Sequence, residues 1–121
     1  MKYLLLIYGQ EGSWASMTQA QAGAMTEEFG KFTQEITENG KNLGGNRLKP
    51  VASATTVRVR DGKRVVTDGP FAETKEQLGG YYLIEAKDLD EAITIAGKIP
   101  SARFGSIEVR PVFEMEQAAR T

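Results

Sequence analysis

Two runs of the chain are almost continuously apolar, which is typical of strands that are buried on both faces. The first is Tyr3–Tyr8 and the second is Gly80–Ala86. Two further segments, Thr56–Arg60 and Ile107–Met115, alternate apolar with charged residues and therefore resemble strands with one exposed face. Pro111 cannot donate a hydrogen bond to a neighbouring strand, so the last strand is expected at an edge of the sheet or interrupted there.

Two helices are predicted from apolar residues that recur every three or four positions. The first starts after Thr18, which has capping-box spacing with Gln21, and stops at Asn39-Gly40. Its apolar stripe consists of Met25, Phe29, Phe32 and Ile36. The second begins after Asp88 and stops at Pro100. Its stripe consists of Leu89, Ala92, Ile93, Ala96 and Ile99.

The segment between the first helix and the second apolar run predicts a hairpin. Thr56–Arg60 and Lys63–Thr67 are strand-like and flank Asp61-Gly62, a pair that favours a type I′ turn. Leu43–Pro50 contains a weaker strand signal, broken by two glycines. Trp14 is expected in a loop after the first strand, where its indole N–H needs a partner if it is buried.

These elements predict an α+β fold: a ferredoxin-like βαββαβ arrangement with an additional β-hairpin, in which both helices cover one face of an antiparallel sheet. The 121 residues suffice for a single domain over 1–121. Such a sheet leaves its other face uncovered. If that face is apolar, a second copy of the chain is the simplest cover, so a homodimer is expected.

Composition narrows the functional classes. With 15 basic and 16 acidic side chains the formal charge is −1, which argues against general binding to nucleic acid or to an anionic membrane. The apolar N-terminal run is too short for a secretory signal or a membrane span, so we expect a cytoplasmic protein. Neither cysteine nor histidine is present. Thiolate and imidazole chemistry is thereby excluded, and no metal, nucleotide or other cofactor is predicted.

The best candidate site in the sequence is the segment Asp68–Gly80, a turn-forming stretch with several ionisable groups. Pro70 restricts the backbone after Asp68, whose carboxylate either caps the turn or binds a ligand. Glu73 and Lys75 form a solvated loop or, if they share a partly dry pocket, a pair suited to proton transfer or to holding a polar ligand.

Further candidates are arginines. Arg110 shares a strand face with Glu108, and Arg47 could join them if its loop lies nearby. Arg110 would suit an anionic ligand, or else an ion pair or a dimer contact. The basic side chains of the predicted hairpin have no aromatic residue between them that could stack on bases. They are therefore expected to protect the strand edges against aggregation rather than to bind nucleic acid. Among the aromatic residues, Tyr8 or Tyr82 could present a hydroxyl to a cavity.

The segment from Thr67 to Ile84, with its sequence TDGPFAETKEQLGGYYLI, resembles the signature of the DGPF-domain family, a branch of the YCII-related proteins. Met1–Tyr8, Thr55–Arg58 and Glu108–Pro111 are similar too. The resemblance implies a dimeric α+β barrel of ferredoxin-like subunits. Some relatives are proposed to be enzymes through a histidine and aspartate pair, which a chain without histidine cannot supply, and some associate with extracytoplasmic-function sigma factors.

The sequence thus predicts a protein that binds a small polar or anionic molecule in a pocket of such a barrel. Carboxylate-based catalysis is a possible extension, with Asp68, Glu73 and Lys75 as the candidate catalytic residues, and whether the protein is an enzyme stays open. The predicted ligand-binding residues are Asp68, Glu73, Lys75, Arg110 and Arg47. The alternative is a regulatory interaction module with a partner among transcription factors.

Overall fold

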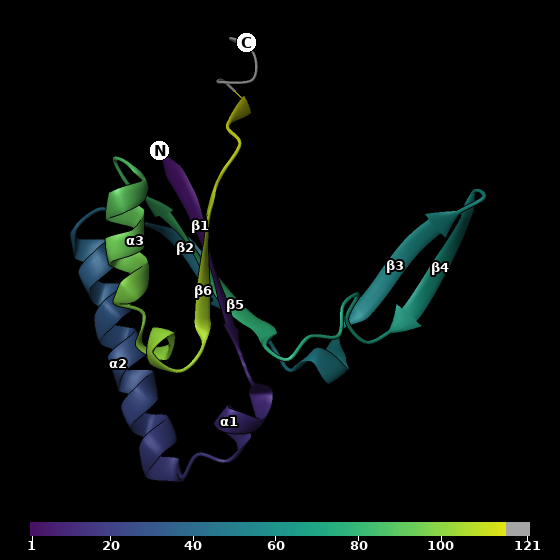
Figure 1. Ribbon diagram of the computed structural model, residues 1–121, viewed down its shortest axis with the longest axis horizontal. Helices are drawn as coiled ribbons and strands as arrows, with labels where there is room; N and C mark the ends of the chain where they lie inside the picture. Colours follow the sequence, from purple (N-terminus) through teal and green to yellow (C-terminus); the bar gives the residue numbers. More distant parts are fainter. Residues whose placement is uncertain (116–121) are drawn as a thin grey trace.

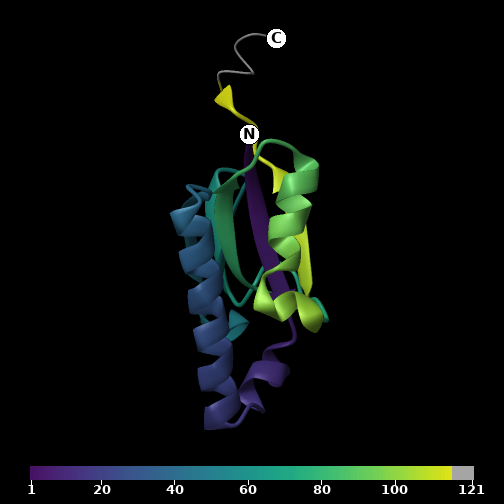
Figure 2. The same ribbon diagram turned by 90° about the vertical axis from the view of Figure 1, so that its left-hand side faces the viewer.

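The computed structural model describes residues 1–115. One antiparallel sheet has the strand order β2-β5-β1-β6. Its strands are β1 (Lys2–Gly9), β2 (Asn42–Arg47), β5 (Gln77–Glu85) and β6 (Ser106–Pro111). Two helices, α2 (Gln19–Glu38) and α3 (Leu89–Gly97), lie side by side on one face of the sheet (Figures 1 and 2). This is the predicted ferredoxin-like arrangement, with the two most apolar strands in the centre and β6 at an edge.

The long helix α2 begins and ends where its sequence predicts. Thr18 and Gln21 form a complete capping box, in which the Thr18 hydroxyl accepts from the Gln21 N–H at 3.1 Å and the Gln21 side chain accepts from the Thr18 N–H at 2.9 Å. Gly40 ends the helix with a φ of 71°, a conformation that costs glycine little. The helix therefore lies across the sheet with its apolar stripe inward.

The core lies between the helices and the sheet. Its fully buried large side chains are Tyr3, Leu5, Ile84 and Ile99. Because successive strand residues point to opposite faces, Leu4, Leu6 and Leu83 point to the other side of the sheet, where they are only half-buried. We call this side the open face. It is the uncovered face that the sequence predicts.

A separate two-stranded sheet is formed by β3 (Thr55–Arg60) and β4 (Lys63–Asp68). Asp61 and Gly62 connect the strands with φ angles of 52° and 72°, which confirms the predicted type I′ turn. Figure 1 shows this hairpin standing away from the body of the molecule, on the side of the main sheet opposite the helices. Its direction in space is a feature that the local sequence pattern does not encode.

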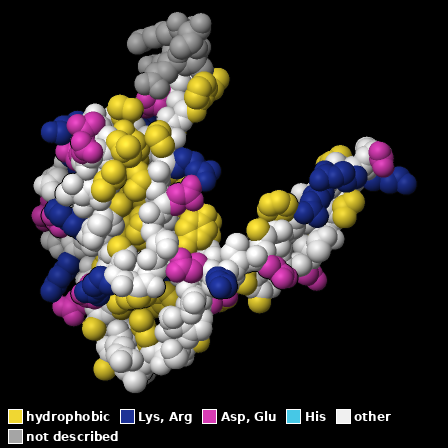
Figure 3. Space-filling model, in the orientation of Figure 1, with side chains coloured by type: hydrophobic (Ala, Val, Ile, Leu, Met, Phe, Trp, Pro, Cys, Tyr) yellow, Lys and Arg dark blue, Asp and Glu magenta, His cyan; other side chains and the backbone are white. Residues whose placement is uncertain are grey.

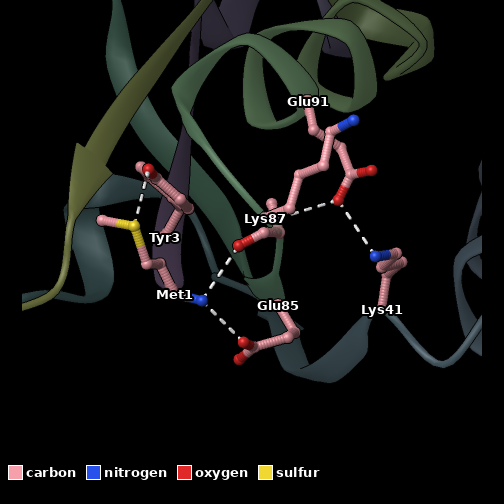
Figure 4. Close-up of polar contacts among 7 residues, drawn as sticks. Met1, Tyr3, Lys41, Glu85, Lys87 and Glu91 are labelled. Atoms are coloured by element: carbon pink, nitrogen blue, oxygen red, sulfur yellow. Dashed lines mark hydrogen bonds and ion pairs between the residues drawn. The ribbon is translucent and has the colours of Figure 1, made fainter.

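Polar contacts join β2, β5 and α3 at one end of the sheet (Figure 4). Lys41 donates to the Glu91 carboxylate at 2.9 Å, and the backbone N–H of Lys87 donates to the same oxygen at 3.0 Å. Hydrogen bonding to Lys41 lowers the pKa of Glu91 from its usual value. The Met1 ammonium is paired with Glu85. These contacts hold the start of α3 beside the strands.

Several predicted boundaries differ from the structure. Trp14 lies in a short helix, α1 (Glu11–Ala15), and not in a loop. The second central strand starts at Gln77, three residues before the apolar run Gly80–Ala86 that predicts it, and runs through Gly79 and Gly80. The last strand ends at Pro111, short of its predicted length. The terminal tail expected over 116–121 lies outside the described residues. No helix within residues 1–115 has the length and apolar character needed to cross a membrane.

Candidate functional site

A cavity of about 610 Å³ lies between the middle of α2 and the adjoining end of the sheet. Short helix α1 and the 3-10 helix η2 (Pro100–Arg103), with the turn that follows it, contribute to its walls. Its aromatic lining comes from Trp14, Phe29, Tyr82 and Phe104, together with Tyr8 and Tyr81. The Trp14 and Phe29 ring centroids are 6.3 Å apart, so α1 packs onto α2 through these two rings. The cavity is therefore largely apolar and offers flat surfaces.

Among residues 1–115, Arg47 is the one cationic side chain that lines this cavity. It lies opposite Gly80 on β5, which in turn lies opposite the core-packed Ile7, so its side chain is on the helix-facing side of the sheet. Its guanidinium carbon is 5.3 Å from the centroid of the Trp14 ring, a cation–π distance. Among the described residues it makes no ion pair. Its side chain is exposed at the edge of the cavity, where the charge lies beside an aromatic ring and has no carboxylate partner among residues 1–115.

Two glycines allow β2 and β5 to approach each other closely at this edge of the sheet, and they place no side chain in the cavity. A Cβ at Gly45 would lie 2.7 Å from the Tyr81 carbonyl oxygen and 3.0 Å from the ring of Tyr82. A Cβ at Gly80 would lie 3.0 Å from the Asn46 carbonyl oxygen. Both positions therefore require glycine for the close approach of β2 and β5, and neither adds a side chain to the cavity.

Two hydroxyl groups meet at the cavity wall. The Thr33 hydroxyl donates to the Phe29 carbonyl at 2.9 Å, and its oxygen is 2.7 Å from the Tyr82 hydroxyl oxygen. Since a threonine hydroxyl has one hydrogen, Tyr82 is the donor in the second contact. Both residues line the cavity. The Tyr82 oxygen therefore keeps capacity to accept a hydrogen bond, but not to donate one, toward a bound molecule.

The cavity adjoins the loop that leads to the hairpin. Leu48 and Pro50 from this loop line it, as does Glu11 from α1. The Glu11 carboxylate accepts from the backbone N–H of Val51 at 2.8 Å, and the Glu11 N–H donates to the Gln77 side chain at 3.2 Å. The acidic group of the wall is thus engaged in holding α1 against the loop.

Ser101 is a further polar residue of the lining, contributed by η2. It is 3% exposed, and its hydroxyl oxygen has no hydrogen-bond partner among the described residues. A buried hydroxyl without a partner is uncommon in folded proteins, because its lost hydration is not replaced. Ser101 therefore has unused hydrogen-bonding capacity at the cavity wall.

Of the five predicted ligand-binding residues, Arg47 alone lines the cavity, and the two tyrosines considered for a cavity, Tyr8 and Tyr82, line it as well. Asp68 is exposed at the end of β4, and Glu73 and Lys75 are exposed in the loop before β5. Arg110 lies on β6, at the opposite edge of the sheet from Arg47, and is paired with Glu108. The structure therefore does not bring Arg47 and Arg110 together, and Arg110 has the ion pair that was its alternative interpretation.

A family model for the YCII-related domain matches residues 1–116. The chain belongs to the YCII-related family. An uncharacterised protein of Rhizobium meliloti (strain 1021) is 38% identical to this YCII-related domain over 114 residues, covering 93% of this chain and 92% of the relative. The family predicted from the sequence is therefore confirmed. Membership supports the predicted fold class, but it shows no activity.

A solved structure with the same fold is 5-chloro-2-hydroxyhydroquinone dehydrochlorinase from Burkholderia phenoliruptrix AC1100, in complex with 2,5-dihydroxybenzoquinone. It aligns with a TM-score of 0.56 over 97% of this YCII-related domain and 98% of the dehydrochlorinase, at 13% sequence identity. At that identity the likeness shows the α+β fold alone.

Sequence reasoning did not single out most of the cavity wall. Phe29 has the spacing of a core residue, and Trp14 stands in a short segment with no clear helical pattern. Besides Arg47, only the need of the Trp14 indole for a partner and the possible cavity hydroxyl of Tyr8 or Tyr82 pointed toward this region. In this YCII-related domain the cavity is formed by segments that are distant in the sequence. The charged residues of the loop before β5 are close together in the sequence but do not line the cavity.

Proposed function

We propose that this YCII-related domain binds a small anionic molecule with a flat, largely apolar body in the cavity between α2 and the sheet. The observation that carries the proposal is the guanidinium of Arg47, which makes no ion pair with residues 1–115 and lies against the Trp14 ring in a largely apolar lining. A cation kept away from carboxylates in such surroundings is stabilised when an anion binds beside it.

The other polar groups of the wall refine the ligand class. An arginine fork matches the two oxygens of a carboxylate, and the aromatic side chains provide contact area for a ring. Tyr82 offers an acceptor, since its hydrogen is given to Thr33. A ring compound that carries a carboxylate and a hydroxyl group would use all three features. The small ring compound bound to the dehydrochlorinase is in keeping with a ligand of this size.

Pairs of compounds that differ in charge test the proposal. Benzoate and 4-hydroxybenzoate are compared with benzamide and 4-hydroxybenzamide by isothermal titration calorimetry and by thermal unfolding. We expect the acids, and not the amides, to bind and to raise the melting temperature. A ligand at a concentration 100 times its Kd stabilises a protein by about 2.7 kcal/mol, enough for a shift of several degrees.

Two arginine variants provide the matched comparison. Arg47→Gln is expected to weaken binding of the acids by about 10- to 100-fold, the usual effect of losing a charged hydrogen bond. Arg110→Gln removes the same charge at the far edge of the sheet and should leave binding unchanged. Equal affinity of Arg47→Gln and the wild-type protein for the acids, or binding of the amides as tight as that of the acids, would contradict the proposal.

A further inference from the structure

Ser101 combines a fixed backbone with a side chain that has no hydrogen-bond partner. Its carbonyl oxygen accepts from the backbone N–H groups of Phe104 at 3.2 Å and Gly105 at 2.8 Å. Among residues 1–115, its hydroxyl oxygen is the one buried side-chain nitrogen or oxygen atom without such a partner. The structure therefore holds the residue firmly at the cavity wall while its hydroxyl stays unpaired.

A buried, unpaired hydroxyl lowers stability, because the hydrogen bonds it made to water are not replaced. Alanine would fill the same place without this cost. Figure 3 shows hydrophobic side chains exposed on the surface between η2 and α1, and Phe104, directly after η2, is also a lining residue of the cavity. Groups that reduce stability in this way are common where a ligand binds, because the ligand provides the missing partner.

The segment that carries Ser101 is anchored to the long helix. Arg103 of η2 donates to both carboxylate oxygens of Glu28 on α2, at 3.1 and 2.8 Å. This fork of two parallel hydrogen bonds restricts the orientation of both side chains. Together with the contacts of η2 to β1 and β6, it fixes the wall on the side of the cavity where Ser101 lies.

Ser101 and Arg47 line the cavity from two sides. Arg47 is on β2, whereas η2 contacts β1 and β6, and β5 lies between β2 and β1 in the sheet. Since neighbouring strands are about 4.8 Å apart, β2 and β1 are separated by roughly 10 Å. A benzene ring with polar groups on opposite carbons has a length of this order. One ring compound can therefore reach both residues.

We infer that Ser101 determines ligand specificity: its hydroxyl donates a hydrogen bond to an acceptor oxygen of the bound anion, across the ring from the group held by Arg47. This inference rests on the proposed function, because it concerns the same ligand in the same cavity. It narrows the ligand class to ring compounds with a carboxylate at one end and a carbonyl or similar acceptor oxygen at the other. An analogue without that oxygen would leave the Ser101 hydroxyl unpaired, which is how such sites discriminate.

Two acids of similar shape and equal charge test the inference. 4-Acetylbenzoate presents a carbonyl oxygen at the position where 4-isopropylbenzoate has a methyl group. Both are titrated calorimetrically into the wild-type protein and Ser101→Ala. We expect Ser101→Ala to bind 4-acetylbenzoate about 3- to 10-fold more weakly than the wild type does, the usual effect of losing one uncharged hydrogen bond. Its affinity for 4-isopropylbenzoate should equal that of the wild type.

Thr26→Val provides the matched control. Thr26 also lines the cavity, but its hydroxyl already donates to the Ala22 carbonyl at 2.9 Å. Its loss should change the affinities for the two acids by the same factor. Urea denaturation gives a second readout: the midpoint of Ser101→Ala should equal or exceed that of the wild type, because the deleted hydroxyl has no partner in the free protein.

The outcomes separate this inference from the proposed function. If Arg47→Gln weakens binding of both acids while Ser101→Ala affects the two acids equally, only the role of Ser101 is overturned. A clear fall in the urea midpoint of Ser101→Ala would overturn it as well, because the hydroxyl would then have a partner within the protein. If the wild-type protein binds neither acid, both the inference and the proposed function fail.

Discussion

The hydroxyl oxygens of Thr33 and Tyr82 lie 2.7 Å apart and join the long helix to a central strand at the cavity wall. Thr33→Val removes the acceptor of the Tyr82 hydroxyl, and we expect it to lower the free energy of unfolding by about 1–2 kcal/mol. Tyr82→Phe removes the donor and leaves Thr33 bonded to Phe29. Urea denaturation of both single variants and the double variant should show a double loss smaller than the sum, and strict additivity would count against the bond.

Trp14 is the single tryptophan of the chain and lines the cavity beside Arg47. Its fluorescence should therefore report on ligand binding directly, with an emission change that saturates as 4-hydroxybenzoate is added. The Arg47→Gln variant should need a correspondingly higher concentration to give the same change. If the calorimetric titration shows binding while the Trp14 emission stays constant, the acid binds somewhere other than this cavity.

Acid should weaken the fold through Glu28 and Glu91. A hydrogen bond from Arg103 lowers the pKa of Glu28, and one from Lys41 lowers the pKa of Glu91, relative to the usual value of 4.5. Because the pKa is lower in the folded state, the stabilisation is fully present above the unfolded pKa and is lost as the pH falls through the folded one.

The Glu91→Gln variant should accordingly lose stability at pH 7 and lose less than the wild type between pH 5 and pH 3. Glu73→Gln is the control, since Glu73 is exposed and makes no ion pair with any residue from 1 to 115. Urea midpoints at each pH measure the effect. An identical pH dependence for Glu91→Gln and the wild type would show that the contact with Lys41 does not contribute.

The loop candidates have a direct test of their own. A ligand or catalytic role for Asp68, Glu73 and Lys75 stays a prediction, but none of the three lines the cavity. The variant in which they become Asn, Gln and Gln should therefore bind 4-hydroxybenzoate within about twofold of the wild type, as expected of surface changes remote from a site. A tenfold loss in the calorimetric titration would return the ligand site to this loop.

Much of the fold follows from local patterns. The capping box at Thr18, the apolar stripe of α2 and the Asp61-Gly62 turn each determine structure within a few residues, so they could be predicted from the sequence. The order of strands in the sheet follows from the two most apolar runs, which need neighbours on both sides. The start of β5 was harder to predict because Gly79 and Gly80 usually interrupt strands, and here they serve the close approach of β2.

The candidate site depends on relations that the sequence does not reveal. Asp68 ends β4 at the base of the hairpin, two residues before Pro70, and it is exposed and does not line the cavity. Arg47 lines the cavity because it lies opposite Gly80 in the register of β2 and β5. This register determines the side of the sheet to which the Arg47 side chain points. Neither the direction of a hairpin nor the register of a weak edge strand can be read from composition or spacing.

The loop containing Leu48 and Pro50 touches the cavity at one end and carries the hairpin at the other. If the homodimer expected from the sequence restrains this loop, occupancy of the cavity and association of the chains are thermodynamically linked, and the effect of each on the other is equal. Ligand affinity would then depend on protein concentration, and a ligand would shift the monomer–dimer equilibrium. A titration at a single protein concentration would report an apparent constant that combines the two equilibria.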